Sequence, residues 1–307
     1  MKLLMFAVNG QKPKLGVLQN GRVIDVAKLG ETVRAGMQPA TIIELIEAGD
    51  RGLEALRQLL SKDDAKADGV THKLNDVKLF SPVVGSRSDV LAIGLNYRKH
   101  AEEGARIHGT EVKPPTIFTK GAFSLTGPYD DIVADESLTK KLDWEVELGV
   151  VVGKAGANIK RERAFDHVFG YTVVNDVSAR DMQHGWGGQW YKGKSLDYSS
   201  PCGPWVVTKD EIPDPQRLQL RCSVNGVVKQ NANTRDMIYS VDALMEWTSV
   251  GMTLPSGMVI ASGTPEGIGN ARTPPEFLVP GNVMETEIEA IGTLRNQIVG
   301  VLALQRT

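Results

Sequence analysis

The segment LDWEVELGVVV, residues 142–152, is the most informative stretch of the chain. Side chains alternate between the two faces of a strand, so Asp143, Glu145 and Glu147 are expected to share one face. A row of like charges repels itself, and it persists either in open solvent or around a cation. The apolar run at residues 150–152 is typical of a buried strand, which favours the cation over a solvated face.

A second apolar segment, residues 171–174, is also followed by a carboxylate, Asp176. Carboxylates buried at the ends of neighbouring strands are costly without compensation. All-oxygen ligation favours Mg²⁺, with Mn²⁺ or Ca²⁺ as competitors. We therefore predict a divalent-cation site at Glu145, Glu147 and Asp176. The alternative for Asp176 is a cap on a helix that starts near Ser178.

Short apolar segments separated by Gly and Pro turns dominate the chain after about residue 77, which indicates a mainly β body with few helices. Helical periodicity is clear there only at residues 240–250. The predicted strands are residues 90–94, 116–120, 144–153, 168–174, 205–208, 218–224, 258–262 and 283–288.

The first 76 residues have a different texture and are predicted to form a small α/β domain in front of a catalytic domain at residues 77–307. Residues 1–30 read as short strands with turns at Asn9-Gly10 and Asn20-Gly21. A capping-box pattern at Thr41 and a periodic stretch at residues 51–60 predict two short helices. The polar residues 61–78 are expected to be a linker.

Composition excludes several classes of protein. The 307 residues carry a formal net charge of −2, with no basic excess that would indicate a nucleic-acid partner. The apolar stretches are too short to span a membrane, and the N-terminus lacks a cleavage-site pattern, so we expect a cytoplasmic protein. Cys202 and Cys222 are too few for a disulfide scaffold and lack zinc-site spacing.

Five motifs, in this order, resemble the fumarylacetoacetate hydrolase family. The resemblance covers most of the chain after about residue 80, and the N-terminal segment is similar to an accessory domain that some members carry. The motifs are GLNY at 94–97 with His100 and Glu103, WEVEL at 144–148, NDVSARD at 175–181 with Gln183, KGKSLD at 192–197 and SGTPEG at 262–267.

The resemblance implies an α+β, mainly β fold with a mixed β-roll catalytic domain, usually as a homodimer. It implies Mg²⁺ or Mn²⁺ on Glu145, Glu147 and Asp176, which leaves Asp143 outside the ligand set. It also implies a small 2-oxo or β-diketo acid as substrate. Members hydrolyse, decarboxylate, isomerise or tautomerise such acids, and a metal-stabilised enolate is common to these reactions.

His100 and Glu103 are predicted to be a catalytic pair, since residues three apart share a helix face. Glu103 would orient the imidazole, and His100 would take a proton from water. On its own, the pair fits an exposed and mobile helix equally well. The resemblance implies a lid that orders over the substrate. The other four histidines are assigned no role.

Four further residues complete the predicted site. Lys194 follows a glycine-rich loop and is implied by the resemblance to neutralise charge on the enolate. Arg180 and Gln183 would contact substrate oxygens, although a plain surface helix is the alternative. Thr264 would bind the substrate carboxylate, although a tight turn would also explain its motif.

Two departures from the family pattern guide the choice of reaction. A fourth metal-site carboxylate is absent before His100, which favours the acylpyruvase-like branch, and Tyr198 replaces a small residue. The aromatic residues at 184–191 would line the distal pocket or pack in a dimer. Our first hypothesis is hydrolysis of a C–C bond in an acylpyruvate or fumarylpyruvate-like acid. The alternatives are oxaloacetate decarboxylation or tautomerisation, a hydroxymuconate-type isomerisation, and a non-catalytic metal-binding protein.

Overall fold

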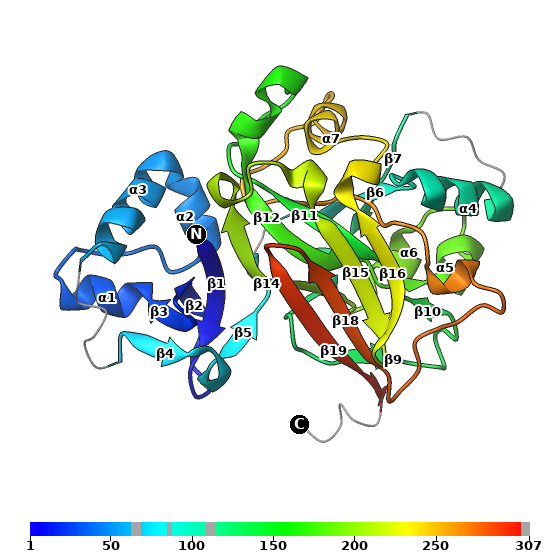
Figure 1. The fold of residues 1–307 in the computed structure, drawn as a ribbon, viewed down its shortest axis with the longest axis horizontal. Coiled ribbons are helices and arrows are strands. Elements are labelled where there is room, and N and C mark those ends of the chain that lie inside the picture. The colour runs from blue at the N-terminus through cyan, green and yellow to red at the C-terminus, as the bar shows by residue number, and fades with distance from the viewer. Residues whose placement is uncertain (63–68, 85–87, 109–113, 302–307) are drawn as a thin grey trace.

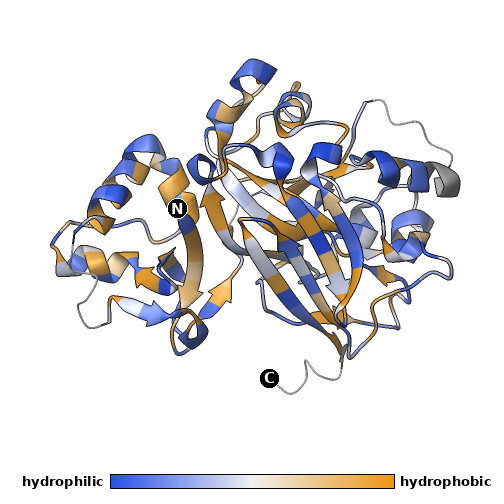
Figure 2. Cartoon of the chain, viewed as in Figure 1, coloured by the Kyte–Doolittle hydropathy of each residue, from blue (hydrophilic) through white to orange (hydrophobic). Residues whose placement is uncertain are grey.

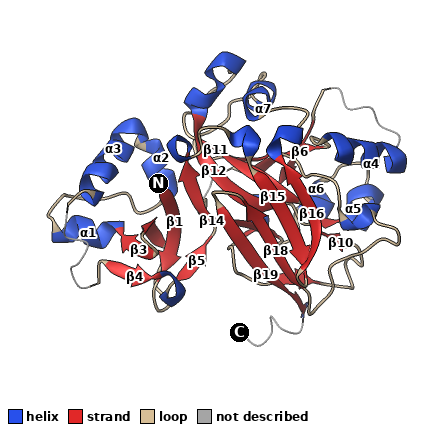
Figure 3. Ribbon diagram, viewed as in Figure 1, coloured by secondary structure: helices blue, strands red, loops and turns tan. Residues whose placement is uncertain are grey.

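The computed structural model describes residues 1–62, 69–84, 88–108 and 114–301 of the chain. Two β-sheets form its body, and helices surround them (Figures 1 and 3). Within the described ranges, no helix is long and apolar enough to cross a membrane. The mainly β fold with modest helix content is confirmed.

The larger sheet has 12 strands among the described residues. Strands β5 (Lys78–Phe80) and β8 (Leu125–Thr126) pair with β1 and β14 beside its main path. The order along that path is β4 (Thr71–Lys73), β3 (Arg22–Asp25), β2 (Lys14–Gln19), β1 (Lys2–Ala7), β14 (Ser200–Thr208), β12 (Val168–Asn175), β11 (Val146–Val152), β17 (Val259–Ala261), β6 (Val90–Gly94) and β7 (Thr116–Lys120).

A second sheet, drawn in front of the first in Figure 1, packs against it. Leu148 and Val173 of the larger sheet share one buried cluster with Leu220, Met284 and Leu294 of the smaller one. The order of the smaller sheet is β16 (Val227–Asn233), β15 (Gln219–Val224), β18 (Val283–Ile288), β19 (Gly292–Gly300) and β9 (Ile132–Ala134).

Successive side chains of β11 point to opposite faces of the sheet and pack into two different hydrophobic clusters. Leu148 and Val150 belong to the cluster between the sheets, whereas Val151 belongs to a second cluster on the opposite face. Burying each such side chain contributes roughly 1.5–3 kcal/mol. Since both faces are covered, β11 is buried along its whole length. Glu147 alternates with Leu148 and so lies on the same face as Val151.

The N-terminal segment contributes strands to the larger sheet and three helices to its edge. Strand β1 pairs with β2 and also with β14, so the sheet continues into the body of the molecule. In Figure 2, these joining strands are largely hydrophobic. The division at residue 76 stays a prediction. The helices are α1 (Val26–Thr32), α2 (Ile42–Glu47) and α3 (Gly49–Leu60).

The predicted linker and the all-strand interpretation of the first 30 residues were wrong in part. Residues 71–73, within the predicted linker, form strand β4 because they pair with β3, and the last linker residue, Lys78, begins strand β5, which pairs with β1. Tertiary pairing overrides a polar local composition. Residues 26–32 are helical, and the Asp25 side chain caps them by accepting from the Lys28 N–H. Linker residues 63–68 lie outside the described residues.

Two boundaries near the carboxylates also differ from the prediction. The strand expected from residue 144 begins at Val146, and Leu142–Asp143 form a separate short strand, β10. Strand β10 pairs with β13 (Ser178–Ala179), so the helix expected near Ser178 begins at Arg180 instead. The remaining helices are α4 (Arg98–His108), α5 (Arg180–Gly185), α6 (Tyr191–Lys194) and α7 (Val241–Thr248).

Candidate active site

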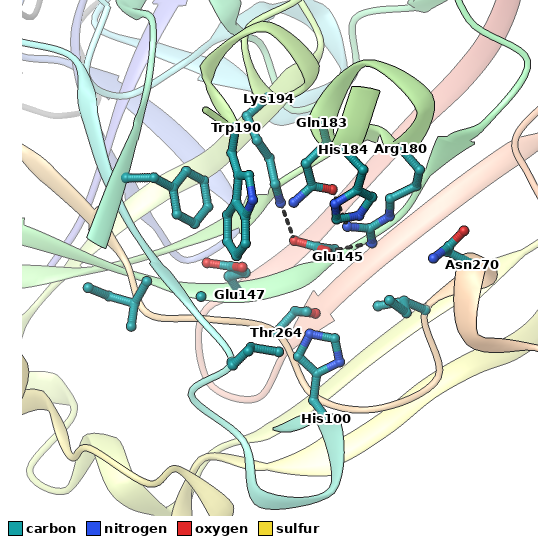
Figure 4. A pocket seen from close by; sticks show the side chains of 15 residues that line it. His100, Glu145, Glu147, Arg180, Gln183, His184, Trp190, Lys194, Thr264 and Asn270 are labelled. Atoms are coloured by element: carbon teal, nitrogen blue, oxygen red, sulfur yellow. Dashed lines mark hydrogen bonds and ion pairs between the residues drawn. The ribbon is translucent and has the colours of Figure 1, made fainter. Parts of the chain in front are cut away.

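A cavity of about 280 Å³ lies where α4, α5 and α6 meet the start of β11. The structure brings seven of the nine predicted site residues to its wall, and Glu103 and Asp176 lie directly behind two of them. Figure 4 shows two groups of side chains on either side of the glutamates. The seven are His100, Glu145, Glu147, Arg180, Gln183, Lys194 and Thr264.

Glu145, Glu147 and Asp176 form a buried cluster. Each offers one oxygen, and these atoms lie within 4.8 Å of one another. Glu145 precedes β11 and Glu147 lies within it, while Asp176 follows the neighbouring strand β12. The antiparallel pairing of Val146 with Asn175 brings them together.

Two cations hold Glu145 from one side. Its Oε1 lies 2.5 Å from Arg180 Nη2, and its Oε2 lies 2.7 Å from Lys194 Nζ. Burial alone would raise the pKa of Glu145, but the charges of Arg180 and Lys194 outweigh it and hold that pKa well below its usual range. For Lys194, burial alone would lower the pKa, but the negative charges of Asp176 and Glu145 outweigh burial and raise that pKa above its usual value. The glutamate and the lysine therefore stay charged.

Asp176 lies between two lysines, one of which the sequence analysis missed. Lys194 Nζ lies 2.7 Å from its Oδ2, and Lys120 Nζ lies 2.6 Å from its Oδ1. Lys120 ends β7, is fully buried and also donates to the backbone oxygens of Val177 and Lys194. Burial lowers the pKa of Lys120. The sequence of β7, TIFTK, gave little signal for this role, because the strand carries two threonines and Lys120 is its one buried residue.

Glu147 is held differently. Within the described ranges it has no ion-pair partner, and its Oε2 accepts from the Gly263 N–H at 2.9 Å. Burial, followed by the charges of Asp176 and Glu145, raises the pKa of Glu147 well above its usual value. Gly263 has a φ of +97°, and a Cβ there would lie 2.6 Å from Asn96 Cβ, so this contact requires glycine.

Asp143 lies outside the cluster, as we expected. Its carboxylate accepts from Arg180 Nε at 2.8 Å and from the backbone N–H groups of Trp144, Gly269 and Asn270. The Trp144 N–H donates to the Asp143 side chain and the Glu145 N–H to the Asn175 side chain, so neither joins a backbone ladder and the strand begins only at Val146. Asp143 thus positions Arg180, which in turn contacts Glu145.

The cluster fits a divalent cation. Asp176 Oδ1 is buried and accepts no hydrogen bond, although Lys120 Nζ is close. The four carboxylates of residues 143, 145, 147 and 176 face three cations, Lys120, Arg180 and Lys194, which leaves one negative charge uncompensated near Glu147. An all-oxygen set with spare negative charge suits Mg²⁺ or Mn²⁺.

His100 and Glu103 lie on α4, and Figure 4 shows His100 across the cavity from Lys194. His100 Nδ1 lies 3.3 Å from Glu103 Oε2, and Glu103 also accepts from the Gly267 N–H at 3.3 Å. The His100 side chain is only 8% exposed, which does not fit the exposed-helix alternative. Nδ1 faces the glutamate, so Nε2 is the nitrogen left to exchange a proton with a bound molecule.

Helices α5 and α6 carry the opposite wall. Gly193 lets them pack closely, because a Cβ there would lie 2.3 Å from the Gln183 backbone nitrogen. Arg180 is buried rather than on a surface helix, and its Nη1 donates to Gln183 Oε1 at 3.0 Å. Gln183 therefore presents its amide NH₂ as the group available to a substrate. Asp176 does not cap α5, because its oxygens face the two lysines.

The Thr264 hydroxyl accepts a hydrogen bond from Gln230 Nε2 at 2.8 Å. Gln230 comes from the other sheet and was not foreseen, because nothing in the polar sequence of β16 distinguishes it. Thr264 lies in the loop at residues 262–267, whose Gly263 N–H contacts Glu147. This loop is therefore part of the site and not only a turn.

The aromatic stretch at residues 184–191 contributes in part. Trp190 lines the cavity, contacts Phe118 edge-on at a centroid distance of 5.1 Å and covers Gly94. His184 and Asn270, which had no predicted role, also line the wall. Tyr198 is 63% exposed and is not part of the lining.

Comparison with known proteins identifies relatives of this chain. The family model "Fumarylacetoacetate (FAA) hydrolase C-terminal" matches residues 89–299. Oxaloacetate tautomerase YisK of Bacillus subtilis (strain 168) is 40% identical, with 91% of this chain and 95% of that protein aligned. The mitochondrial oxaloacetate tautomerase fahd2 of Xenopus laevis is 39% identical, with 97% and 90% aligned.

Solved structures match along nearly the whole chain. The fumarylacetoacetate hydrolase of Exiguobacterium antarcticum is 35% identical with a TM-score of 0.80, covering 98% of this chain and 99% of that one. The maleylpyruvate hydrolase of Sphingobium sp. SYK-6, in complex with manganese(II) and pyruvate, is 28% identical with a TM-score of 0.76 and the same coverage.

Proposed function

This chain belongs to the fumarylacetoacetate hydrolase family, and from that premise we propose that it is a divalent-metal-dependent oxaloacetate tautomerase. The observation that carries the proposal is the likeness, over 91% and 97% of the chain, to two relatives that are named oxaloacetate tautomerases. The cavity of about 280 Å³ lies at the small end of ligand pockets and suits a four-carbon acid. The proposal replaces C–C hydrolysis, our first hypothesis, as the leading candidate.

Tautomerisation moves a proton between C3 of oxaloacetate and the oxygen on C2, through an enolate. A Mg²⁺ or Mn²⁺ ion held by Glu145, Glu147 and Asp176 would act as a Lewis acid toward the 2-oxo group. The chain itself must supply a base for the carbon-bound proton and donors for the oxygen. It must also keep the three carboxylates in place.

His100 is the proposed base. Its Nδ1 faces Glu103, which stabilises the protonated imidazole, so Nε2 can take the proton from C3 and deliver it to the enolate oxygen on C2, with the same transfers reversed for the opposite direction. Glu103 is itself held by the Gly267 N–H, so the pair is tied to the loop that carries Thr264. The same pair, acting on water instead of carbon, would serve a hydrolase.

Lys194 and Gln183 are the proposed partners of the substrate oxygens. Lys194 stays protonated between Glu145 and Asp176, and its positive charge opposes the charge that develops on the enolate. The Gln183 amide NH₂ is oriented by Arg180 through the hydrogen bond to its Oε1. Thr264 would bind a substrate carboxylate. Arg180, whose guanidinium contacts Asp143, Glu145 and Gln183, positions these groups and takes less part in binding than we expected.

Hydrolysis of an acylpyruvate-like acid remains the second candidate. It is supported by the match to the maleylpyruvate hydrolase, which was solved with manganese(II) and pyruvate. Both reactions pass through an enolate, and they differ in whether His100 activates water. Homodimer formation stays a prediction. So does a cytoplasmic location, because the Xenopus laevis relative is named as mitochondrial.

The test measures the decay of the enol absorbance of enol-enriched oxaloacetate in the presence of the protein and Mg²⁺ or Mn²⁺. We expect the enol absorbance to decay faster than with the ion alone, while total oxaloacetate stays constant by NMR. The matched control is Glu145→Gln at the same ion concentration. Faster release of pyruvate, either with CO₂ from oxaloacetate or with a second acid from acetylpyruvate or fumarylpyruvate, would overturn the proposal. A wild-type protein no better than Glu145→Gln in every assay would support the non-catalytic alternative.

A further inference from the structure

Gln230 is a buried amide that links three parts of the site. It lies on β16 between Lys229, which is partly buried, and Asn231, which is exposed, and only 1% of its surface is accessible. A buried amide is costly unless its donors and acceptor are satisfied. Its Oε1 accepts from the Val146 N–H at 3.0 Å, and its Nε2 donates to Thr264 Oγ1 at 2.8 Å and to the Pro265 carbonyl at 2.9 Å.

The backbone partners of Gln230 determine which way its amide faces. Val146 offers an N–H, which only the amide oxygen can accept. Pro265 offers a carbonyl, which only the amide NH₂ can satisfy. The reversed orientation would place like groups against each other at both contacts. Thr264 therefore receives a hydrogen bond from Gln230 and does not donate one to it.

The consequence lies in the single proton of the Thr264 hydroxyl. Both amide hydrogens of Gln230 are used, so the hydroxyl proton must point elsewhere. In the part of the chain that the structure describes, Thr264 Oγ1 donates to no protein group, and its side chain lines the cavity. A hydroxyl held this way presents a donor to an anion, and hydrogen bonds to charged groups are the stronger kind.

Gln230 also sets the position of that donor relative to the carboxylates. Val146 lies between Glu145 and Glu147, and Gln230 connects its backbone to the loop at residues 262–267. The same loop is tied to Glu147 through Gly263 and to Asn96 through the Ser262 carbonyl. A continuous set of hydrogen bonds therefore joins the threonine hydroxyl to the carboxylate cluster.

We propose that Gln230 is a positioning residue that holds the Thr264 hydroxyl as a hydrogen-bond donor to the substrate carboxylate. The proposal rests on the proposed function for the identity of the substrate, but not for the test. Oxalate binds without turning over, and it offers carboxylate oxygens to a metal and to a neighbouring donor. Its affinity in the presence of Mn²⁺ therefore reports on this contact even if oxaloacetate is not the substrate.

The first variant is Gln230→Glu, which keeps the side-chain shape and the contact to Val146 but gives Thr264 an acceptor. The hydroxyl proton then turns toward residue 230 and away from the cavity. We expect oxalate affinity, measured by calorimetry with Mn²⁺, to fall about 10- to 100-fold, the range for a lost bond to a charged group. Mn²⁺ affinity should stay within about twofold. With oxaloacetate, KM should rise while kcat changes little.

The matched control is Asn231→Asp, the same amide-to-acid change one residue further along β16. Asn231 is exposed, where it bonds Gln219, so oxalate affinity should not change. Thr264→Val should lose as much affinity as Gln230→Glu, and Thr264→Ser should retain it. The double variant Gln230→Glu/Thr264→Val should be no weaker than Thr264→Val alone, because both changes remove one hydrogen bond.

Additive losses in the double variant would overturn the proposal, since Gln230 would then act independently of the hydroxyl. Unchanged oxalate affinity in Thr264→Val would also overturn it, and that variant serves if Gln230→Glu does not fold. If oxalate behaves as expected but enol oxaloacetate is not consumed, the proposed function fails and the role of Gln230 stands.

Discussion

The two walls of the cavity hold their acidic groups by different means. On the α5 and α6 side, Glu145 and Asp176 are compensated by Arg180, Lys194 and Lys120 at 2.5–2.7 Å. On the side of the 262–267 loop, Glu147 is held by a backbone N–H, and Thr264 by the neutral amide of Gln230. Figure 4 shows Glu145 and Glu147 between these walls.

The difference indicates where the missing positive charge belongs. The cationic wall is balanced without a metal, and the charges of Arg180 and Lys194 keep the pKa of Glu145 low. The neutral wall is not balanced, because the pKa of Glu147 is raised by burial and by the charges of Asp176 and Glu145. A metal ion would therefore act chiefly on Glu147 and on the substrate next to it, while the cationic wall keeps the ligands in place.

The largest expected effect comes from the cationic wall. Glu145→Gln removes a proposed metal ligand and leaves Arg180 and Lys194 without their shared partner. Activity should fall to the rate that the free ion supports, measured by enol decay. Because breaking a buried pair is costly, the metal-free protein should also lose about 3–5 kcal/mol of unfolding free energy in denaturant titrations. Unchanged stability would mean that the wall is not balanced by these pairs.

His100→Gln should come next, and it should affect turnover alone. Losing a general base costs about 10²–10⁴-fold in rate. Mn²⁺ and oxalate affinities should remain near those of the wild-type protein, because His100 is not a ligand in the carboxylate cluster. A parallel loss of Mn²⁺ affinity would show that the imidazole supports the metal site and that another residue is the base.

Glu147→Gln should change stability less than Glu145→Gln does, and in the opposite direction. It removes a like charge that has no ion-pair partner in the described residues, so the metal-free protein should become more stable. We expect the Tm to rise by a few degrees, ~2–4 °C for each kcal/mol gained. The stabilisation that added Mn²⁺ gives the wild-type protein should be largely lost in this variant.

The pH dependence of the Tm of the metal-free protein tests whether Glu147→Gln is stabilising for the reason given. A buried carboxyl with a raised pKa favours folding below its unfolded value of 4.5, and this contribution is lost as pH rises toward the raised value. Glu145 has a lowered pKa, so its contribution is present above 4.5 and lost as pH falls further. Glu147→Gln should flatten the decline of Tm above pH 4.5. An equal slope in both proteins would contradict the raised pKa.

Much of the site could be predicted because its residues lie in short motifs with clear periodicity. Glu145 and Glu147 stand out in a segment that continues into an apolar strand, and Asp176 directly follows the strand that pairs with it. His100 and Glu103 are one helical turn apart. The boundaries were less reliable. Side chains take the N–H groups of Trp144 and Glu145 and so interrupt the predicted strand, and pairing with β3 converted part of the predicted linker into β4.

The sequence by itself determined the family, the mainly β fold and the set of carboxylates. Alternating burial and short motifs depend only on residues that are close together in the sequence. Only the tertiary structure decided what surrounds those carboxylates. Lys120 reaches Asp176 from 56 positions away, and Gln230 reaches Val146 from 84. Such contacts depend on how two sheets and their loops pack together, since a buried charge or amide must find its partner wherever the fold places one.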